Sequence, residues 1–394
     1  MFVIDILIYV FFAWMMCHYA ENSCKYYPDT DYFDKYIKRF ILFFVIINAV
    51  KYGVGKDYWG YARGLASGYD ENYDCGTEYL FYWFNVLFSN VGLPVSLGFA
   101  IFAFIQIFFI VLAVRKQKYL LLFIPVVLFG GRYFLGMMNA IRQMIVACAF
   151  LWAAKFIIER KFKQYVIFII AASTIHQSAF MLLPIYFIPL KCYNLTDKRM
   201  WLIGILMICF FLGQTPSFQG VVSYIEGLTS LFGYEDKTDF IVNALSRKQS
   251  AEALGFGPIM LSFLLCAILV IWYGPSLKQR YGDVIPMFDL WYAFSFFYSS
   301  AFFLICNVSH YLIRPIQYFE LFQMLMLALI LYDIKERKGG SSLNLWFVIS
   351  IIWVTTVWGM IKNEREKFES STYKLIFFHQ DDMDSIYNGS IFKQ

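Results

Sequence analysis

Three short groups of polar side chains interrupt the long apolar runs of this sequence, and the first surrounds an arginine. Asn139, Arg142 and Gln143 stand at positions i, i+3 and i+4, so they would share one face of a helix. A guanidinium on that face matches the oxygens of a phosphate or carboxylate in a bidentate manner. Arg132 lies near the end of the preceding apolar run.

The second and third groups each contain one of the four histidines of the chain. His310 and Arg314 are four residues apart, and Arg314, Gln317 and Tyr318 would share a helical face. The third group surrounds His176, in the middle of an apolar stretch longer than one membrane span. An imidazole titrates near neutral pH, so either histidine could exchange a proton under physiological conditions.

Each of these residues also has a purely structural interpretation. A lone arginine near the end of a span can extend to the lipid head groups, and a lone histidine can be a hydrogen-bonded packing residue. A polar side chain inside a span nevertheless costs several kcal/mol unless it faces protein or water. Three such groups at one end of the spans favour a functional site.

The elements that must position these groups are membrane spans. Of 394 residues, 60% are hydrophobic and 15% charged, whereas a soluble chain carries roughly a quarter charged residues. A span needs about 20 apolar residues. Candidates lie near 2–20, 38–53, 95–114, 118–135, 139–158, 200–215, 258–274, 285–306, 313–333 and 343–361. The first is expected to be a retained span, because Asp5 stands where a signal peptide has positive charge.

Two further stretches decide the topology. Residues 77–92 are short and aromatic, which predicts an interfacial helix. Residues 163–190 are predicted to form a hairpin of short helices with His176 at its tip, because only then do the basic clusters 115–118, 160–163 and 335–338 all face the cytoplasm. We therefore expect an all-α polytopic membrane protein, one domain over 1–394, with about 12 segments, outer loops 54–94 and 216–257, and a polar tail 362–394.

Several other classes are excluded by what the sequence lacks. It contains no GxxxxGK[ST], HExxH or GxSxG pattern and no CxxC pair, so an ATP-driven motor, a zinc protease, a serine hydrolase of that type and a disulfide framework are not indicated. The net charge of +5 comes from clusters between spans, so we expect no nucleic-acid partner. The acidic run 381–384 is interpreted as a solvated tail, and no metal or cofactor is expected.

Several motifs together resemble the EpsG/Wzy-like family of exopolysaccharide and O-antigen polymerases. Residues 51–61 (KYGVGKDYWGY) resemble the outer-loop motif of that family, and residues 141–143 (IRQ) its central Arg-Gln. Residues 175–179 (IHQSA) resemble a later histidine segment, and Arg314 with Tyr318 stands where the family has a late arginine. The resemblance covers nearly the whole chain in order and spacing.

Two positions depart from the family pattern. Lys51 stands where the family has its first arginine, and a lysine binds phosphate as a point charge without the bidentate fork. Gln177 replaces the usual proline after His176.

The resemblance implies a GT-C-like membrane glycosyltransferase of the bacterial inner membrane, with its active site facing the periplasm or exterior. Its substrate would be an oligosaccharide repeat linked to undecaprenyl diphosphate, and the product would be an O-antigen, capsule or other exopolysaccharide. Membrane lipids would surround it and a chain-length regulator could be its partner. No metal and no cofactor are implied.

For such a reaction the sequence suggests residues for each role. Arg142 and Arg314 would stabilise the departing diphosphate, and His176 would act as the base, with Asp57 as the rival. Arg132 and Lys51 would support the arginines. Further substrate contacts are predicted at Tyr58, Tyr61, Asn139, Gln143, His310, Gln317 and Tyr318.

Two other functions remain open at this stage. A flippase for lipid-linked oligosaccharides would place its cationic residues along a cavity through the depth of the membrane. A membrane O-acyltransferase acting on polysaccharide would use a histidine that meets an acyl donor supplied from the cytoplasm.

Overall fold

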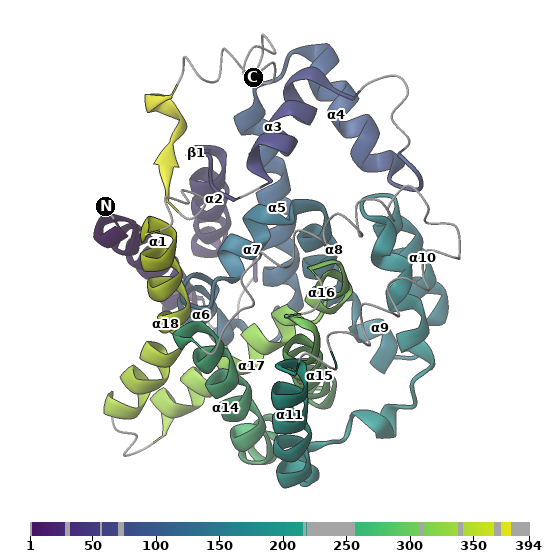
Figure 1. Cartoon of the computed structure of the whole chain (residues 1–394), viewed down its shortest axis with the longest axis vertical. Coiled ribbons are helices and arrows are strands. Elements are labelled where there is room, and N and C mark those ends of the chain that lie inside the picture. Colours follow the sequence, from purple (N-terminus) through teal and green to yellow (C-terminus); the bar gives the residue numbers. More distant parts are fainter. Residues whose placement is uncertain are drawn as a thin grey trace.

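The long apolar runs form helices, because a backbone in hydrocarbon can satisfy its polar groups only within the segment itself. The computed structural model describes residues 2–27, 32–55, 57–69, 75–215, 218, 257–307, 310–337, 342–365 and 372–379 (Figure 1). The predicted outer loop 216–257 and the end of the tail therefore lie almost wholly outside the described residues.

The helices of residues 2–173 differ widely in length. They are α1 (Phe2–Tyr26), α2 (Lys35–Ala49), α3 (Tyr58–Ser67), α4 (Tyr79–Val91), α5 (Val95–Ala113), η1 (Lys118–Leu122), α6 (Ile124–Gly130), α7 (Tyr133–Asn139), α8 (Ile141–Ala153), α9 (Lys155–Ile158) and α10 (Phe162–Ser173).

The C-terminal half contains the 3₁₀ helices η2 (Gln177–Phe187), η3 (Leu190–Tyr193) and η4 (Thr196–Lys198), followed by mostly longer helices. These are α11 (Arg199–Gly213), α14 (Pro258–Tyr281), α15 (Phe288–Ile305), α16 (His310–Gln317), α17 (Glu320–Glu336) and α18 (Ser342–Arg365). Two short strands, β1 (Lys51–Tyr52) and β2 (Lys374–Leu375), and the 3₁₀ turn η6 (Ile376–Phe378) complete the described elements.

Within the described ranges, seven helical segments are long and apolar enough to cross a membrane. The chain is thus a multi-pass membrane protein, as predicted. The predicted number of about 12 spans is not reached by length alone: α2 and α11 have 15 residues each, or about 22 Å against a hydrocarbon core of about 30 Å. The count of 12 and the GT-C-like arrangement remain predictions.

Helix α17 forms the centre of the bundle. In the most apolar 18 residues of the span that contains it, Ile313–Glu336, 83% of the residues are buried, whereas the corresponding share in the span of α1 is 33%. Helices α6, α8, α14, α15 and α18 all contact α17 (Figure 1). Polar side chains on α17 therefore face protein on every side, and each needs a partner or a cavity.

Two predicted spans are interrupted where the site lies, which corrects the expectation of continuous helices over 118–135 and 139–158. Helix α6 ends at Gly130, and Arg132 has a left-handed backbone with φ of 64°. A second break at Ala140, with φ of −98° and ψ of 56°, separates Asn139 on α7 from Arg142 on α8. Residues 139, 142 and 143 therefore do not belong to one helix, and the break lets Asn139 turn in a different direction.

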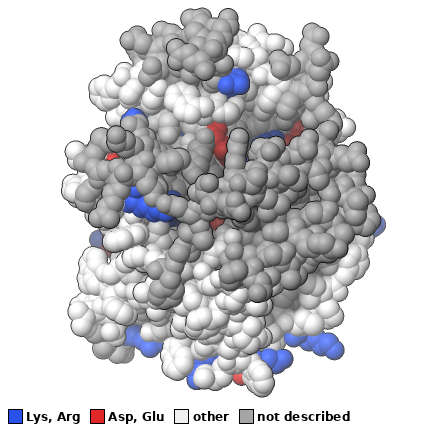
Figure 2. All heavy atoms as spheres, viewed as in Figure 1, with Lys and Arg blue, Asp and Glu red and all other residues white. Residues whose placement is uncertain are grey.

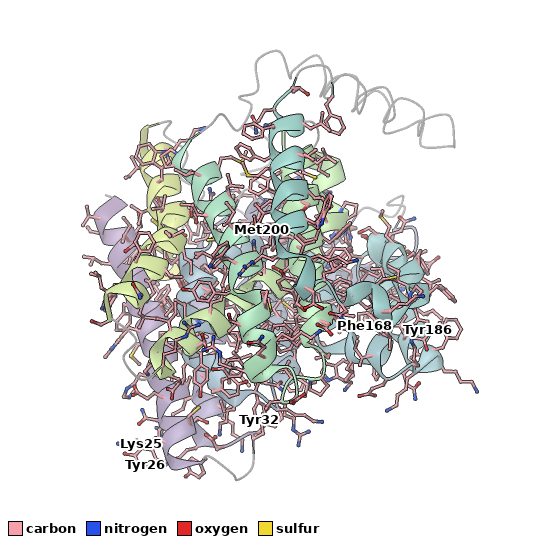
Figure 3. The ribbon with its side chains drawn as sticks, turned by 90° about the horizontal axis from the view of Figure 1, so that it is seen from below. Lys25, Tyr26, Tyr32, Phe168, Tyr186 and Met200 are labelled. Carbon is pink, nitrogen blue, oxygen red and sulfur yellow. The ribbon has the colours of Figure 1, made fainter. Side chains whose placement is uncertain are left out.

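The hairpin predicted over 163–190 is present. Arg160, two residues before α10, donates from Nη1 to the carbonyl oxygen of Tyr186 near the end of η2, at 2.8 Å. The hydroxyl of Tyr165 donates to the carbonyl oxygen of Leu182 at 2.7 Å. The two arms are therefore antiparallel, with His176 at their junction. In the view from below, Phe168 and Tyr186 lie together at one edge of the bundle (Figure 3).

Basic clusters gather at the end of the bundle opposite α3 and α4. Arg280 and Arg337 both form ion pairs with the buried carboxylate of Asp333, at 2.7 and 2.8 Å. Tyr119, beside the 115–118 cluster, stacks on Tyr332 with ring centroids 4.4 Å apart. Figure 2 shows several Lys and Arg side chains along this lower edge. The positive-inside rule would place this end in the cytoplasm, and the orientation stays a prediction.

The all-α expectation missed one small feature near the chain ends. Lys51 and Leu375 are partners in a two-stranded antiparallel ladder formed by β1 and β2. Tyr373 donates its hydroxyl to the carbonyl oxygen of Ile47, and its backbone N–H donates to Asp5 at 3.2 Å. Residues 372–379 thereby fasten the tail to α1, α2 and the residues after α2.

The contact between α11 and α15 gives a direct test of the packing. A Cβ added at Gly213 would lie 2.1 Å from the carbonyl oxygen of Phe303 on α15, so Gly213→Ala must push the two helices apart. We expect a loss of about 1–3 kcal/mol in the free energy of unfolding, seen as a lower midpoint of thermal unfolding in detergent by intrinsic fluorescence. Gly204→Ala on the same helix is the control, because no atom lies within 4 Å of the added Cβ. Equal midpoints for the two variants would contradict this packing.

Candidate functional site

The predicted residues Arg142 and His176 meet at a carboxylate that the sequence had not singled out. Glu78, the residue before α4, accepts a hydrogen bond from Nδ1 of His176 through Oε1 at 2.8 Å. Its Oε2 forms an ion pair with Nη1 of Arg142. The backbone N–H of Gln177 donates to Oε1 of Glu78 at 3.0 Å. One carboxylate therefore joins the hairpin tip to the start of α8.

The start of α4 and the hairpin tip are also joined through their backbones. The N–H groups of Leu80 and Phe81, in the first turn of α4, donate to the carbonyl oxygen of Thr174 at 3.0 and 3.3 Å. The first N–H groups of a helix have no partner within it, so the hairpin tip caps α4. The hydroxyl of Thr77 adds a bond to the carbonyl oxygen of Ser173 at 3.3 Å.

Arg142 is held by aromatic side chains as well as by Glu78. Its guanidinium lies 5.1 Å from the ring centroid of Phe81, a cation–π distance. Tyr61 of α3 is its other neighbour: burial raises the pKa of the Tyr61 phenol, and the positive charge of Arg142 opposes part of that rise. The Arg142 side chain remains 29% exposed, so part of the guanidinium is open to a ligand.

The charge state of Glu78 follows from its partners. Burial by itself raises the pKa of the Glu78 carboxyl, but the hydrogen bond from His176, the charge of Arg142 and the N–H of Gln177 together outweigh it. The pKa of Glu78 therefore lies below its ordinary value of 4.5. At neutral pH the carboxylate is ionised, which favours a proton on Nδ1 of His176.

The third predicted group lies against this cluster. Nε2 of Gln143 donates to the backbone carbonyl oxygen of Arg314, and the hydroxyls of Ser178 and Tyr318 are 2.7 Å apart. Helix α16 thus contacts both α8 and the hairpin. Arg314 itself is exposed and Tyr318 is buried. The side chain of His310 lies outside the described residues.

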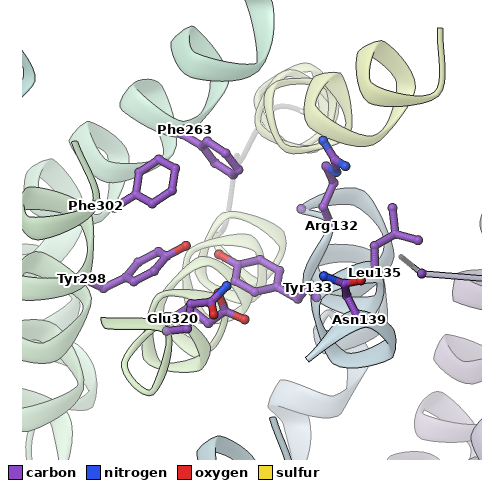
Figure 4. A pocket seen from close by; sticks show the side chains of 12 residues that line it. Arg132, Tyr133, Leu135, Asn139, Phe263, Tyr298, Phe302 and Glu320 are labelled. Carbon is purple, nitrogen blue, oxygen red and sulfur yellow. The ribbon is translucent and has the colours of Figure 1, made fainter. Parts of the chain in front are cut away.

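A cavity of about 250 Å³ lies beside α7 (Figure 4). Three predicted residues line it: Arg132, Asn139 and Gln317. Asn139 also accepts the backbone N–H of Asp57 through Oδ1 at 3.1 Å, which ties the loop after β1 to the cavity wall. Asp57 is exposed.

Two predicted residues lie in the interior instead. Lys51 is 1% exposed, with Nζ 2.7 Å from the sulfur of Met138 and 4.6 Å from the ring centroid of Phe99. Burial lowers the pKa of Lys51 to about 7. Tyr58 is fully buried and stacks on Phe99 with centroids 4.9 Å apart. In this arrangement both pack against Phe99.

A family comparison supports the motif resemblance. The sequence pattern of the EpsG family matches residues 35–375 of this chain. The chain belongs to the EpsG family. EpsG is a family of Wzy-like polymerases, and the match includes Glu78, Arg142, His176 and Arg314 within its range. No curated protein and no solved structure matches the chain.

Two acidic residues of this EpsG protein were missed by the sequence analysis. Glu78 is the second residue of the aromatic segment 77–92, whose composition predicted an interfacial helix. Glu320 lies inside the predicted span 313–333 and lines the cavity. A charged residue inside a span is expected to be functional whether it is acidic or basic, so the position of Glu320 in the sequence was a signal for this site. Among the described residues, no three His, Cys, Asp or Glu side chains group to hold a metal ion, and metal independence stays a prediction.

The lowered pKa of Glu78 predicts a pH-dependent contribution to stability. A carboxyl whose folded pKa is depressed stabilises the fold above its unfolded value, near 4.5, and this contribution is lost as the pH falls through the folded pKa. Glu78→Gln should therefore lower the midpoint of thermal unfolding at about pH 7, with a smaller difference from the parent at about pH 3.5. A difference that is the same at both pH values would show that the charge of Glu78 does not stabilise the fold.

Proposed function

We propose that this protein polymerises oligosaccharide repeats linked to undecaprenyl diphosphate, at the outer face of the bacterial plasma membrane. The observation that carries the proposal is the carboxylate of Glu78 holding His176 and Arg142 beside each other. This pairs a base with a cation, as transfer of a glycan from a diphosphate requires. Membership of the EpsG family supports the reaction class.

His176 is suited to the role of the base. With Nδ1–H donating to Glu78, the Nε2 lone pair is available to accept a proton. The carboxylate also stabilises the imidazolium that forms. Asp57, the rival base, is exposed and contacts the cavity wall through its backbone N–H, which donates to Asn139.

The proposed reaction is a transfer of the growing glycan. A hydroxyl of the incoming lipid-linked repeat attacks the anomeric carbon of the growing chain, and its proton passes to Nε2 of His176. A glycosidic C–O bond forms while the C–O bond to the lipid diphosphate breaks, and the diphosphate leaves with the electron pair. The proton on His176 then returns to solvent.

Arg142 would stabilise the departing diphosphate. A guanidinium carries five N–H donors, and Glu78 is bound at one nitrogen, Nη1. The remaining donors can meet phosphate oxygens where negative charge develops. Arg314 of α16 lies next to this position, because its backbone carbonyl oxygen accepts a hydrogen bond from the side chain of Gln143, the residue after Arg142.

The position of the cluster favours polymerisation over transport. It lies where α3, α4 and the hairpin tip meet, at the end of the bundle away from the basic clusters (Figure 1). A flippase would distribute its cations through the membrane depth, and an acyltransferase would need His176 to meet a cytoplasmic donor. We propose that lipid-linked repeats are the partners of this site, that the protein acts without a metal, and that a chain-length regulator binds it.

His176→Ala should leave cells with single lipid-linked repeats at the surface and no long polymer. Loss of a general base costs about 10²–10⁴-fold in rate. The measurement is the length distribution of surface glycan on gels, with membrane levels of the protein matched. His18→Ala is the control, because His18 is exposed on α1. Within the described ranges its imidazole hydrogen-bonds only to Asn22. Normal polymer with His176→Ala would exclude His176 as the base, and loss of all surface glycan would indicate a flippase.

Arg142→Ala should have the same phenotype, whereas Arg142→Lys should retain shortened polymer, because a lysine keeps the charge without the bidentate fork. Arg39→Ala provides the matched control: Arg39 is exposed and contacts only the ring of Tyr36, at 5.6 Å, among the described residues. Long polymer from Arg142→Ala would show that another group stabilises the diphosphate.

A further inference from the structure

The cavity beside α7 has two chemically different walls (Figure 4). Arg132 and Asn139, both at the ends of α7, belong to one wall. Glu320 and Tyr298, from α17 and α15, belong to the other. Figure 4 shows the rings of Phe263 and Phe302 beside Tyr298. A cation, an acid and a set of aromatic rings therefore border the same space.

Glu320 is the buried acid of this cavity and has an unused oxygen. The residue is 6% exposed, and the hydroxyl of Tyr298 hydrogen-bonds to its carboxyl group. Its Oε1 has no hydrogen-bond partner among the residues that the structure describes. The nearest atom to a Cβ added at Gly136, which also lines the cavity, would be this Oε1, at 3.5 Å. An unsatisfied buried polar atom is costly, so Oε1 is placed to accept a hydrogen bond from a ligand in the cavity.

Arg132 supplies the complementary charge. It sits at the break between α6 and α7 in a left-handed conformation, and its Nη1 lies 3.0 Å from where a Cβ of Gly359 would be. Among the described residues, no carboxylate forms an ion pair with it. A partly buried guanidinium without a carboxylate partner among the described residues is suited to an anionic ligand.

The size of the cavity limits what can enter. About 250 Å³ is less than the roughly 300–1,000 Å³ of sites for drug-sized ligands, so a whole oligosaccharide repeat does not fit. A single hydroxylated ring is the matching size. Aromatic side chains offer apolar faces to such a ring, while Glu320 and Asn139 offer hydrogen bonds to its hydroxyls.

We infer that this cavity binds one sugar ring of the lipid-linked substrate together with an adjoining anionic group. The hydroxyls of the ring bind at Glu320, and the anionic group binds at Arg132. The inference rests on the proposed function and deepens it by giving the substrate a second binding site. Gln317, which lines the cavity, is followed by Tyr318, whose hydroxyl lies 2.7 Å from that of Ser178 at the hairpin tip that carries His176. A substrate could therefore occupy the cavity and the catalytic cluster at the same time.

The test is a kinetic assay with the full-length protein in detergent and lipid-linked repeats extracted from a strain that lacks it. Gly136→Leu should fill the cavity without removing a polar group, and we expect KM for the repeats to rise at least ~10-fold. Glu320→Met/Tyr298→Phe removes both hydrogen-bonding partners, so no buried group is left unsatisfied. This double variant should raise KM about fivefold. In both variants kcat should change little. A misfolded fraction would instead lower kcat and leave KM unchanged, so the two effects can be told apart.

Gly204→Leu on α11 is the control, because a Cβ there meets no atom within 4 Å. If the parent polymerises the repeats and Gly136→Leu keeps the parental KM and thermal midpoint, the cavity inference is wrong and the proposed function stands. If the parent forms no polymer from these repeats, the proposed function fails and the inference falls with it.

Competition in the same assay identifies the source of the anion. Inhibition by pyrophosphate that disappears in Arg132→Gln would place the lipid diphosphate at Arg132, and the same pattern with glucuronate would place an acidic sugar there. Both outcomes support the inference. Inhibition by phosphatidylglycerol alone would make Arg132 a site for lipid head groups and would overturn it.

Discussion

The carboxylate of Glu78 is the interaction on which the rest of the site depends. It is the common acceptor for an imidazole, a guanidinium and a backbone N–H that come from two separate parts of the chain. Removing a shared acceptor of this kind leaves several buried donors without a partner at once. The bundle must therefore deliver three segments to within hydrogen-bonding distance: the residues before α4, the start of α8, and the tip of the α10–η2 hairpin.

Irregular backbone makes this meeting possible. Uninterrupted spans would carry Asn139 and Arg142 on one helical face, as the sequence alone suggests. The break at Ala140 instead assigns Asn139 to the cavity and Arg142 to Glu78. Breaks inside a membrane protein are tolerated where protein or a wet cavity covers the backbone. The central position of α17, surrounded by other helices, provides that cover, and Glu320 on this helix lines the cavity.

Local patterns predicted the multi-pass class, the hairpin at His176 and the gathering of the basic clusters at one end. Each of these depends on apolar runs and on the placement of Lys and Arg, which are visible along the chain. Glu78 was missed because its importance comes from His176, which is 98 residues away, and pairing over such distances leaves no periodic signal. The breaks at Arg132 and Ala140 were missed for a related reason. An apolar run fixes where a span lies, whereas the backbone angles inside it depend on packing against neighbouring helices.

The fastening of residues 372–379 has a consequence for biosynthesis. Strand β1 directly follows the second helix, but its partner β2 is among the last described residues to leave the ribosome. The stretch between α2 and α3 thus cannot reach its final conformation until the spans between these two strands have been made. The chain itself thus delays completion of the region next to the cavity until the helical bundle exists.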